Sequence, residues 1–223
     1  MFEELLKLFG KENLLEQSFT TTIKMLEFDE QMFEASVQTL RHADSADLPF
    51  NIYEKDKKIN KYEREVRRNV LTHLTVSGSK NVGAGLILIS IVIDVERIGD
   101  YTKNIAELAV AHPQKLHGGQ LEEELVEIET SVEARFRHIT RGLLDHDEDV
   151  ARSIMSEHKN IAGRCEKALN DIWSEKDKNL TPGNAVILAL YFRYLKRIAA
   201  HLTNIASSII NPFPRIGFRE KEK

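Results

Sequence analysis

Four acidic residues, in two adjacent stretches of the chain, have the spacing of an oxygen-rich cage for a metal ion. Asp56 and Glu63 are seven residues apart and occupy inward seam positions of a heptad, so on a helix they lie nearly on one line. Glu96 and Asp100 are four residues apart and continue the apolar stripe of their own helix. Carboxylate oxygens gathered in this way suit hard or borderline cations such as Mg, Mn or Fe.

A second interpretation of the same acids needs no metal. Stacked like charges destabilise a helix unless something positive lies between them. The chain offers several cations close by in sequence, so the cage can equally be filled by water or closed by lysine. These cations are Lys57, Lys58, Lys61, Arg64, Arg67, Arg97 and Lys103.

The segments that carry these acids are predicted to be long helices. Sparse break signals separate stretches of apolar residues at helical spacing, and none of the stretches shows sustained alternation. The linker from Pro113 to Gly119 is predicted to be exposed, since Pro and two Gly interrupt the pattern. The predicted fold is all-α, with a short lead helix over 2–9 and six long helices at about 12–43, 50–76, 81–111, 118–144, 148–176 and 181–211.

An internal repeat organises these helices into two units. The segment RIGDYTKNIA at 97–106 and the segment RIAAHLTNIA at 197–206 agree at five of ten positions, at an offset of 100. Both lie in helices that begin apolar on nearly every side, which is typical of the central helix of a bundle. We therefore predict two tandem three-helix bundles, with residues 1–112 as the first repeat with its lead helix, 118–211 as the second and 212–223 as a C-terminal tail.

Bulk composition favours a cytoplasmic protein without a nucleic-acid partner. The formal net charge is -4, and the single cysteine excludes a disulfide framework. No signal-peptide pattern is visible at the start. The longest mostly apolar run, Val82 to Ile93, falls short of the ~20 residues that a membrane span requires. Contact with a membrane is therefore expected only through a partner.

Catalytic signatures are absent from the sequence, which favours a protein that is not an enzyme. There is no P-loop, no GxGxxG after a strand and no nucleophile elbow, and Cys165 has no matched base. A di-metal carboxylate enzyme of the ferritin-like kind would need Glu-x-x-His twice, and no glutamate in the chain has histidine three residues later. A metal-free structural helical adaptor stays open as an alternative.

Two motifs give the chain a resemblance to a known family. The stretch DVERIGDYTKNIAELA at 94–109 resembles the signature of the PhoU phosphate-uptake regulators, E-R-I-x-D followed four residues later by N-I-A. The stretch EKDKKINKYEREV at 54–66 resembles the companion helix of that family. The resemblance implies a regulator that works with a phosphate transporter component and a sensor histidine kinase at the inner face of the membrane. A homodimer stays open.

The resemblance also assigns roles to residues. It implies that Asp56, Glu63, Glu96 and Asp100 are the metal ligands of the first repeat, with Asn60 and Asn104 in support.

The second repeat departs from this pattern, since Lys196 and Ala200 stand where the acids Glu96 and Asp100 stand in the first. We therefore predict no second metal site. His201 is expected to be packed or solvated, and Lys196 and Arg197 supply fixed positive charge in place of a metal.

Overall fold

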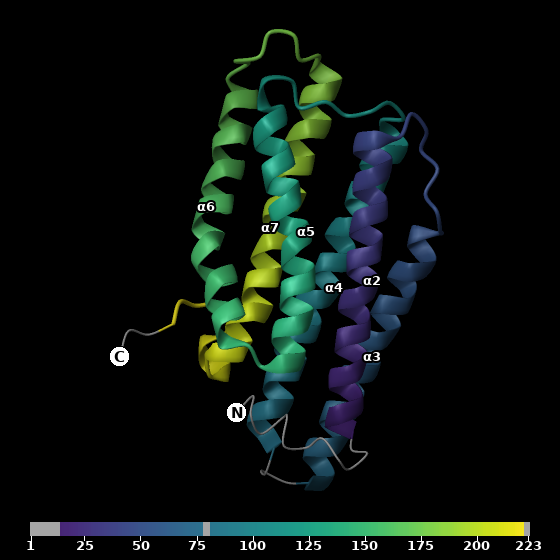
Figure 1. Ribbon diagram of the computed structural model, residues 1–223. Helices are drawn as coiled ribbons and strands as arrows, with labels where there is room; N and C mark the ends of the chain where they lie inside the picture. The colour runs from purple at the N-terminus through teal and green to yellow at the C-terminus, as the bar shows by residue number, and fades with distance from the viewer. Residues whose placement is uncertain (1–13, 78–80, 221–223) are drawn as a thin grey trace.

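The computed structural model describes residues 14–77 and 81–220, and within these ranges it contains helices and no strand (Figure 1). This confirms the predicted all-α fold with six long helices. The predicted lead helix over 2–9 and the first two residues of the predicted helix 12–43 lie outside the described residues. The six helices are α2 (Leu14–His42), α3 (Ile52–Ser77), α4 (Val82–Ala111), α5 (Glu122–Asp145), α6 (Glu148–Trp173) and α7 (Pro182–Ile210).

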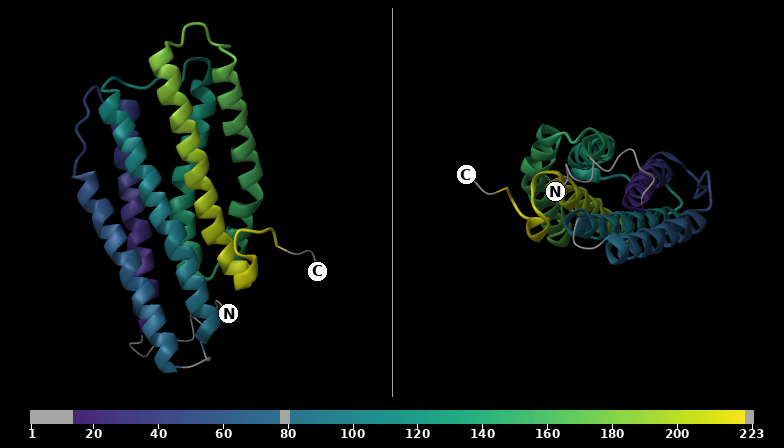
Figure 2. Two further views of the ribbon diagram at one scale, coloured as in Figure 1. Left: turned by 180° about the vertical axis from the view of Figure 1, so that it is seen from behind. Right: turned by 90° about the horizontal axis from the view of Figure 1, so that it is seen from below.

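The helices form two three-helix bundles that lie side by side (Figure 2). In the first bundle α2, α3 and α4 pack on one another, and in the second α5, α6 and α7 do the same. The bundles meet where α4 packs against α7 and where α2 packs against α5. Among the described residues, no helix is long and apolar enough to cross a membrane.

Local chemistry at the helix ends explains where the boundaries differ from the prediction. The helix expected from 118 starts with a 3-10 turn, η2 (Gly119–Leu121), and α5 proper begins at Glu122. It ends where His146 adopts a left-handed conformation with φ 52°. The Asp147 carboxylate then accepts hydrogen bonds from two backbone N–H groups of the first turn of α6, at 3.1 and 3.0 Å.

The linker between the bundles is only partly exposed, so the prediction for it was wrong at its centre. Leu116 is fully buried, and its N–H donates to the carbonyl oxygen of Leu40 at 2.9 Å. The reason is that the one large apolar residue of the linker covers the end of the core, and buried backbone polar groups must then find partners. The Leu116 carbonyl accepts from the side chain of Arg41.

Arg41 forms a buried polar network that joins both bundles and their linker. Its side chain is 2% exposed, and its Nε donates to Glu129 of α5 at 2.8 Å. Its other nitrogens reach the carboxylate of Glu122 and the carbonyl of Leu116. Tyr191 of α7 donates to Glu129 at 2.7 Å. Burial raises the pKa of Glu129, and the nearby Arg41 guanidinium opposes this shift.

We predict that Arg41→Met lowers the free energy of unfolding by roughly 3–5 kcal/mol, because it leaves Glu129 as a buried charge without its cation. Urea denaturation followed by circular dichroism measures the change. The matched control is Arg137→Met on α5, whose exposed ion pair with Glu133 is worth at most about 1 kcal/mol. Equal losses in the two variants would contradict the prediction.

Candidate functional site

The four predicted acids gather along the contact between α3 and α4. Asp56 and Glu63 lie on α3 and Glu96 and Asp100 on α4, and three of the four side chains are at most 20% exposed. The pKa of Glu96 is raised by its burial and then by the neighbouring carboxylates of Asp100 and Glu63. The structure therefore brings the acids within electrostatic range of one another, across one gap between two helices.

Lys103 lies between two of these acids. Its ammonium group is 3.0 Å from an oxygen of Asp56 and 3.0 Å from an oxygen of Asp100. Burial alone would lower the pKa of Lys103, but its hydrogen bonds to Asp100 and Asp56 raise it above the usual value. The lysine thus supplies the positive charge that this end of the acidic cluster requires.

The remaining predicted residues make weaker or separate contacts. Arg67 pairs with Glu63 at 2.8 Å, and Arg97 lies 3.6 Å from Glu96. Asn60 donates to the second oxygen of Asp56 at 3.4 Å. Asn104 is half-buried on α4 and makes no hydrogen bond to the four acids.

Asp29 of α2 is a fifth acid that sequence reasoning missed. It is fully buried, and neither carboxylate oxygen has a hydrogen-bond partner. A Cβ atom on Gly99 of α4 would lie 2.8 Å from one of these oxygens, so glycine leaves room for the carboxyl group. Burial, followed by the charges of Glu96, Asp56 and Asp100, raises the pKa of Asp29 well above its usual value.

The donor set suits a hard cation by chemical type, but Lys103 occupies the position between Asp56 and Asp100. As the side chains stand, no three His, Cys, Asp or Glu residues within 14–77 and 81–220 converge to hold a metal. A cation at this site would replace the lysine ammonium and would also approach the unpartnered Asp29.

The second bundle places different groups at the corresponding positions of α7. Lys196 pairs with Glu166 of α6. His201 is 2.7 Å from Asp94 of α4, and Asn204 donates to the same Asp94 oxygen at 3.1 Å. His201 is therefore a packing contact between the bundles.

The fold and the candidate site define an all-helical protein of two linked three-helix bundles with an acidic strip in the first. Residues 22–109 match the PhoU domain, and this segment contains all six predicted site residues. The PhoU homolog of the phosphate-specific transport system of Pseudomonas putida, an accessory protein, is 31% identical over 191 residues, which cover 81% of this chain and 72% of the relative. The chain belongs to the PhoU family.

Further relatives agree with this assignment. An accessory protein of the same name from Synechocystis sp. is 21% identical. The match covers 89% of this chain and 88% of the Synechocystis protein. The crystal structure of PhoU from Pseudomonas aeruginosa superimposes with a TM-score of 0.78 at 22% identity, over 88% of this chain and 95% of that one. The crystal structure of the phosphate transport system regulatory protein PhoU from Streptococcus pneumoniae superimposes with a TM-score of 0.72 at 19% identity. The match covers 94% of this chain and 95% of that one. At these identities the structures establish the fold.

Replacement of Asp29 by Asn should stabilise the metal-free protein at neutral pH. The folded state keeps the Asp29 proton to a higher pH than the unfolded state, whose pKa is near the usual 3.8, so stability falls as the pH rises above that value. Asparagine removes this loss, and we expect a gain of about 1–3 kcal/mol at pH 7 that disappears near pH 4. Urea unfolding in chelator at several pH values measures it.

The matched control for this prediction is Asp145→Asn, an exposed acid of α5 paired with Arg141. Its effect should stay within about 0.5 kcal/mol at every pH. A loss of stability in Asp29→Asn across the whole pH range would show that the carboxylate has a favourable partner in the metal-free state.

Proposed function

We propose that this protein is a non-catalytic accessory regulator of phosphate uptake. The observation that carries the proposal is the 31% identity to an accessory protein of a phosphate-specific transport system, across 81% of the chain. We further propose that it acts in the cytoplasm, at the inner face of the membrane, through contact with a phosphate transporter component or a sensor histidine kinase. Such a role requires a rigid surface and no reacting group, and a pair of joined helical bundles supplies that surface.

Deletion of the gene should uncouple phosphate uptake from phosphate supply. In cells grown with abundant phosphate, we expect uptake of radiolabelled phosphate to rise above that of the parent strain, and the intact gene on a plasmid should restore control. The protein, tagged at one end, should also co-purify with a transporter subunit or kinase from solubilised membranes. Unchanged uptake control in the deletion strain would refute the proposal.

We also propose that the acids between α3 and α4 bind a divalent or trivalent cation such as Mg, Mn or Fe. Asp56, Glu63, Glu96 and Asp100 would hold it, with Asn60 and Asn104 in support. The pKa of Glu96, which is raised by burial and then by repulsion from Asp100 and Glu63, supports this proposal, as does the unpartnered carboxyl group of Asp29. When bound, the cation supplies positive charge that offsets this repulsion and helps to fix α3 against α4.

Metal should therefore raise the melting temperature of the chelator-stripped protein. At a free metal concentration of a hundred times Kd, the expected stabilisation is about 2.7 kcal/mol. The double variant Glu96→Ala with Asp100→Asn should lose this gain. The matched control is Glu166→Ala with Asp171→Asn, two acids of α6 in the second bundle. If Mn, Fe and Mg all leave the melting temperature of the wild type unchanged, the metal site does not exist, and the regulatory role stands without it.

A further inference from the structure

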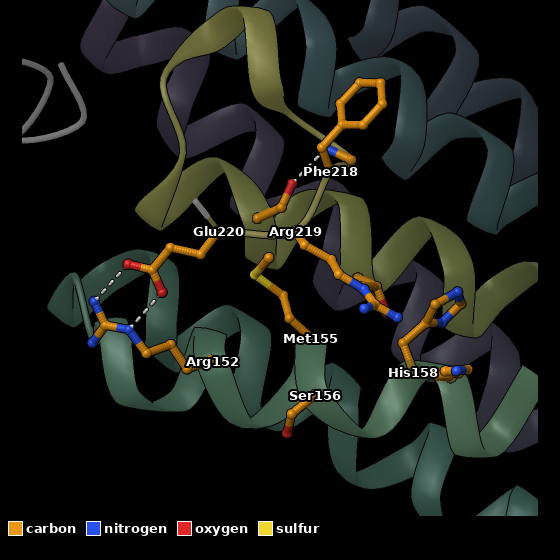
Figure 3. A pocket seen from close by; sticks show the side chains of 11 residues that line it. Arg152, Met155, Ser156, His158, Phe218, Arg219 and Glu220 are labelled. Atoms are coloured by element: carbon orange, nitrogen blue, oxygen red, sulfur yellow. Dashed lines mark hydrogen bonds and ion pairs between the residues drawn. The ribbon is translucent and has the colours of Figure 1, made fainter. Parts of the chain in front are cut away.

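The second bundle contains a cavity of about 560 Å³ where α6 faces the end of α7 (Figure 3). Met155 and His158 of α6 and Thr203 of α7 form part of its lining, and Gly217 to Glu220 form another wall. This volume is within the range of small-molecule sites, which are typically 300–1,000 Å³.

The wall that follows α7 is held in place by specific hydrogen bonds. Asn211 donates to the carbonyl oxygen of Phe218 at 2.6 Å and to that of Arg215 at 3.1 Å. The N–H of Gly217 donates to Ser207 at 2.7 Å, and Gly217 has a φ of 83°, which favours glycine. These contacts turn the C-terminal segment back over α6 and close the cavity on that side.

The charged groups in the cavity are mostly positive. Arg152 forms an ion pair with Glu220 at the rim, with Nε 3.0 Å from the carboxylate, and it also pairs with Glu148 and Asp149 of α6 (Figure 3). Lys159, His158 and Arg219 remain as the other ionisable lining groups. In Figure 3 the Arg219 side chain extends along the cavity toward His158. The lining therefore carries a surplus of hydrogen-bond donors and positive charge.

A buried arginine lies directly behind this lining. Arg135 of α5 is 2% exposed and donates through Nη1 to Thr203 at 3.1 Å. Its Nε and Nη2 have no hydrogen-bond partner, although Nη2 lies 3.6 Å from a carboxylate oxygen of Glu157. His158 also has a buried Nδ1 without a partner. Burial, followed by the charges of Arg135 and Lys196, lowers the pKa of His158, as expected where negative charge is scarce.

The first bundle has the opposite charge at the corresponding helices. At the offset of 100 between α4 and α7, Lys196 replaces Glu96 and Thr203 replaces Lys103. The first helix of each bundle also buries an ionisable side chain with polar atoms that lack a hydrogen-bond partner, Asp29 on α2 and Arg135 on α5. The local charge at these two places is therefore opposite: carboxylates gather between α3 and α4, whereas Lys159 and Arg219 line the cavity of the second bundle.

We propose that the cavity in the second bundle binds a phosphate group, either inorganic phosphate or that of a phosphate monoester. Arg219, Lys159 and His158 would donate to its oxygens, and Arg135 would support the site through Thr203. A phosphate group accepts hydrogen bonds from several directions, which matches donors on α6 and on the segment after α7. The cavity exceeds the size of one phosphate ion, and Met155 offers an apolar surface for the body of an ester.

Isothermal titration of the full chain in chelator tests this site separately from the metal site and from transport. The probes are inorganic phosphate and ribose 5-phosphate, with ribose as the uncharged control. We expect Arg219→Ala and Lys159→Ala each to weaken binding by about tenfold, since each removes a charged donor. The matched control Arg141→Ala, on the exposed face of α5, should leave binding unchanged.

The two probes distinguish the source of the phosphate group. Binding of both indicates inorganic phosphate as a sufficient ligand, and binding of ribose 5-phosphate alone indicates a phosphorylated metabolite. In either case, the ring nitrogen resonances of His158 should shift on binding, a readout that a merely structural role would not move. The proposal is overturned if neither probe binds at millimolar concentration, or if the Arg219 and Lys159 variants bind as tightly as the wild type.

Discussion

The side chain of Arg41 leaves α2 at the point where the two bundles and their linker meet, and it is buried from solvent there. Buried charges are tolerated only when their donors find acceptors, so Glu129, Glu122 and the Leu116 carbonyl must all be in place. These partners come from α5 and the linker, and Tyr191 of α7 completes the network. One buried cation thereby joins the first bundle to the second, beside the larger packing contact of α4 on α7.

Within this frame, the same helical architecture positions the two proposed sites, whose local charges are opposite. The first bundle buries Asp29 beside a row of carboxylates, and the second buries Arg135 behind a basic cavity. Each of these buried groups lacks full hydrogen bonding, which costs stability in a protein without its ligand. A pair of repeats that share a fold and differ in charge is consistent with one scaffold that serves two binding functions.

The sequence predicted the parts of the structure that local patterns encode. Helical periodicity located the six helices to within a few residues, and the seam positions placed Asp56, Glu63, Glu96 and Asp100 together. Asp29 was missed because it stands in an acidic stretch with Glu27 and Glu30 and matches no motif, although it lies four residues after Met25 and three before Met32, on the buried face of α2. The buried position of Leu116 and the closing segment after α7 depend on contacts between distant parts of the chain, which a single sequence does not show.

The helix α4 lies between the two proposed sites. On one face this helix carries Glu96 and Asp100, and on another it carries Asp94, which is held by His201 and Asn204 of α7. About two turns past Asp94 on α4, Tyr101 stacks on His201 and accepts a hydrogen bond from Arg197 at 3.1 Å. Asn204 lies three residues after His201 on α7. The residue just before it, Thr203, lines the basic cavity. Coupling between two sites requires a packed element that both of them contact. The α4–α7 pair is such an element, because α4 packs on α3 through one face and on α7 through another.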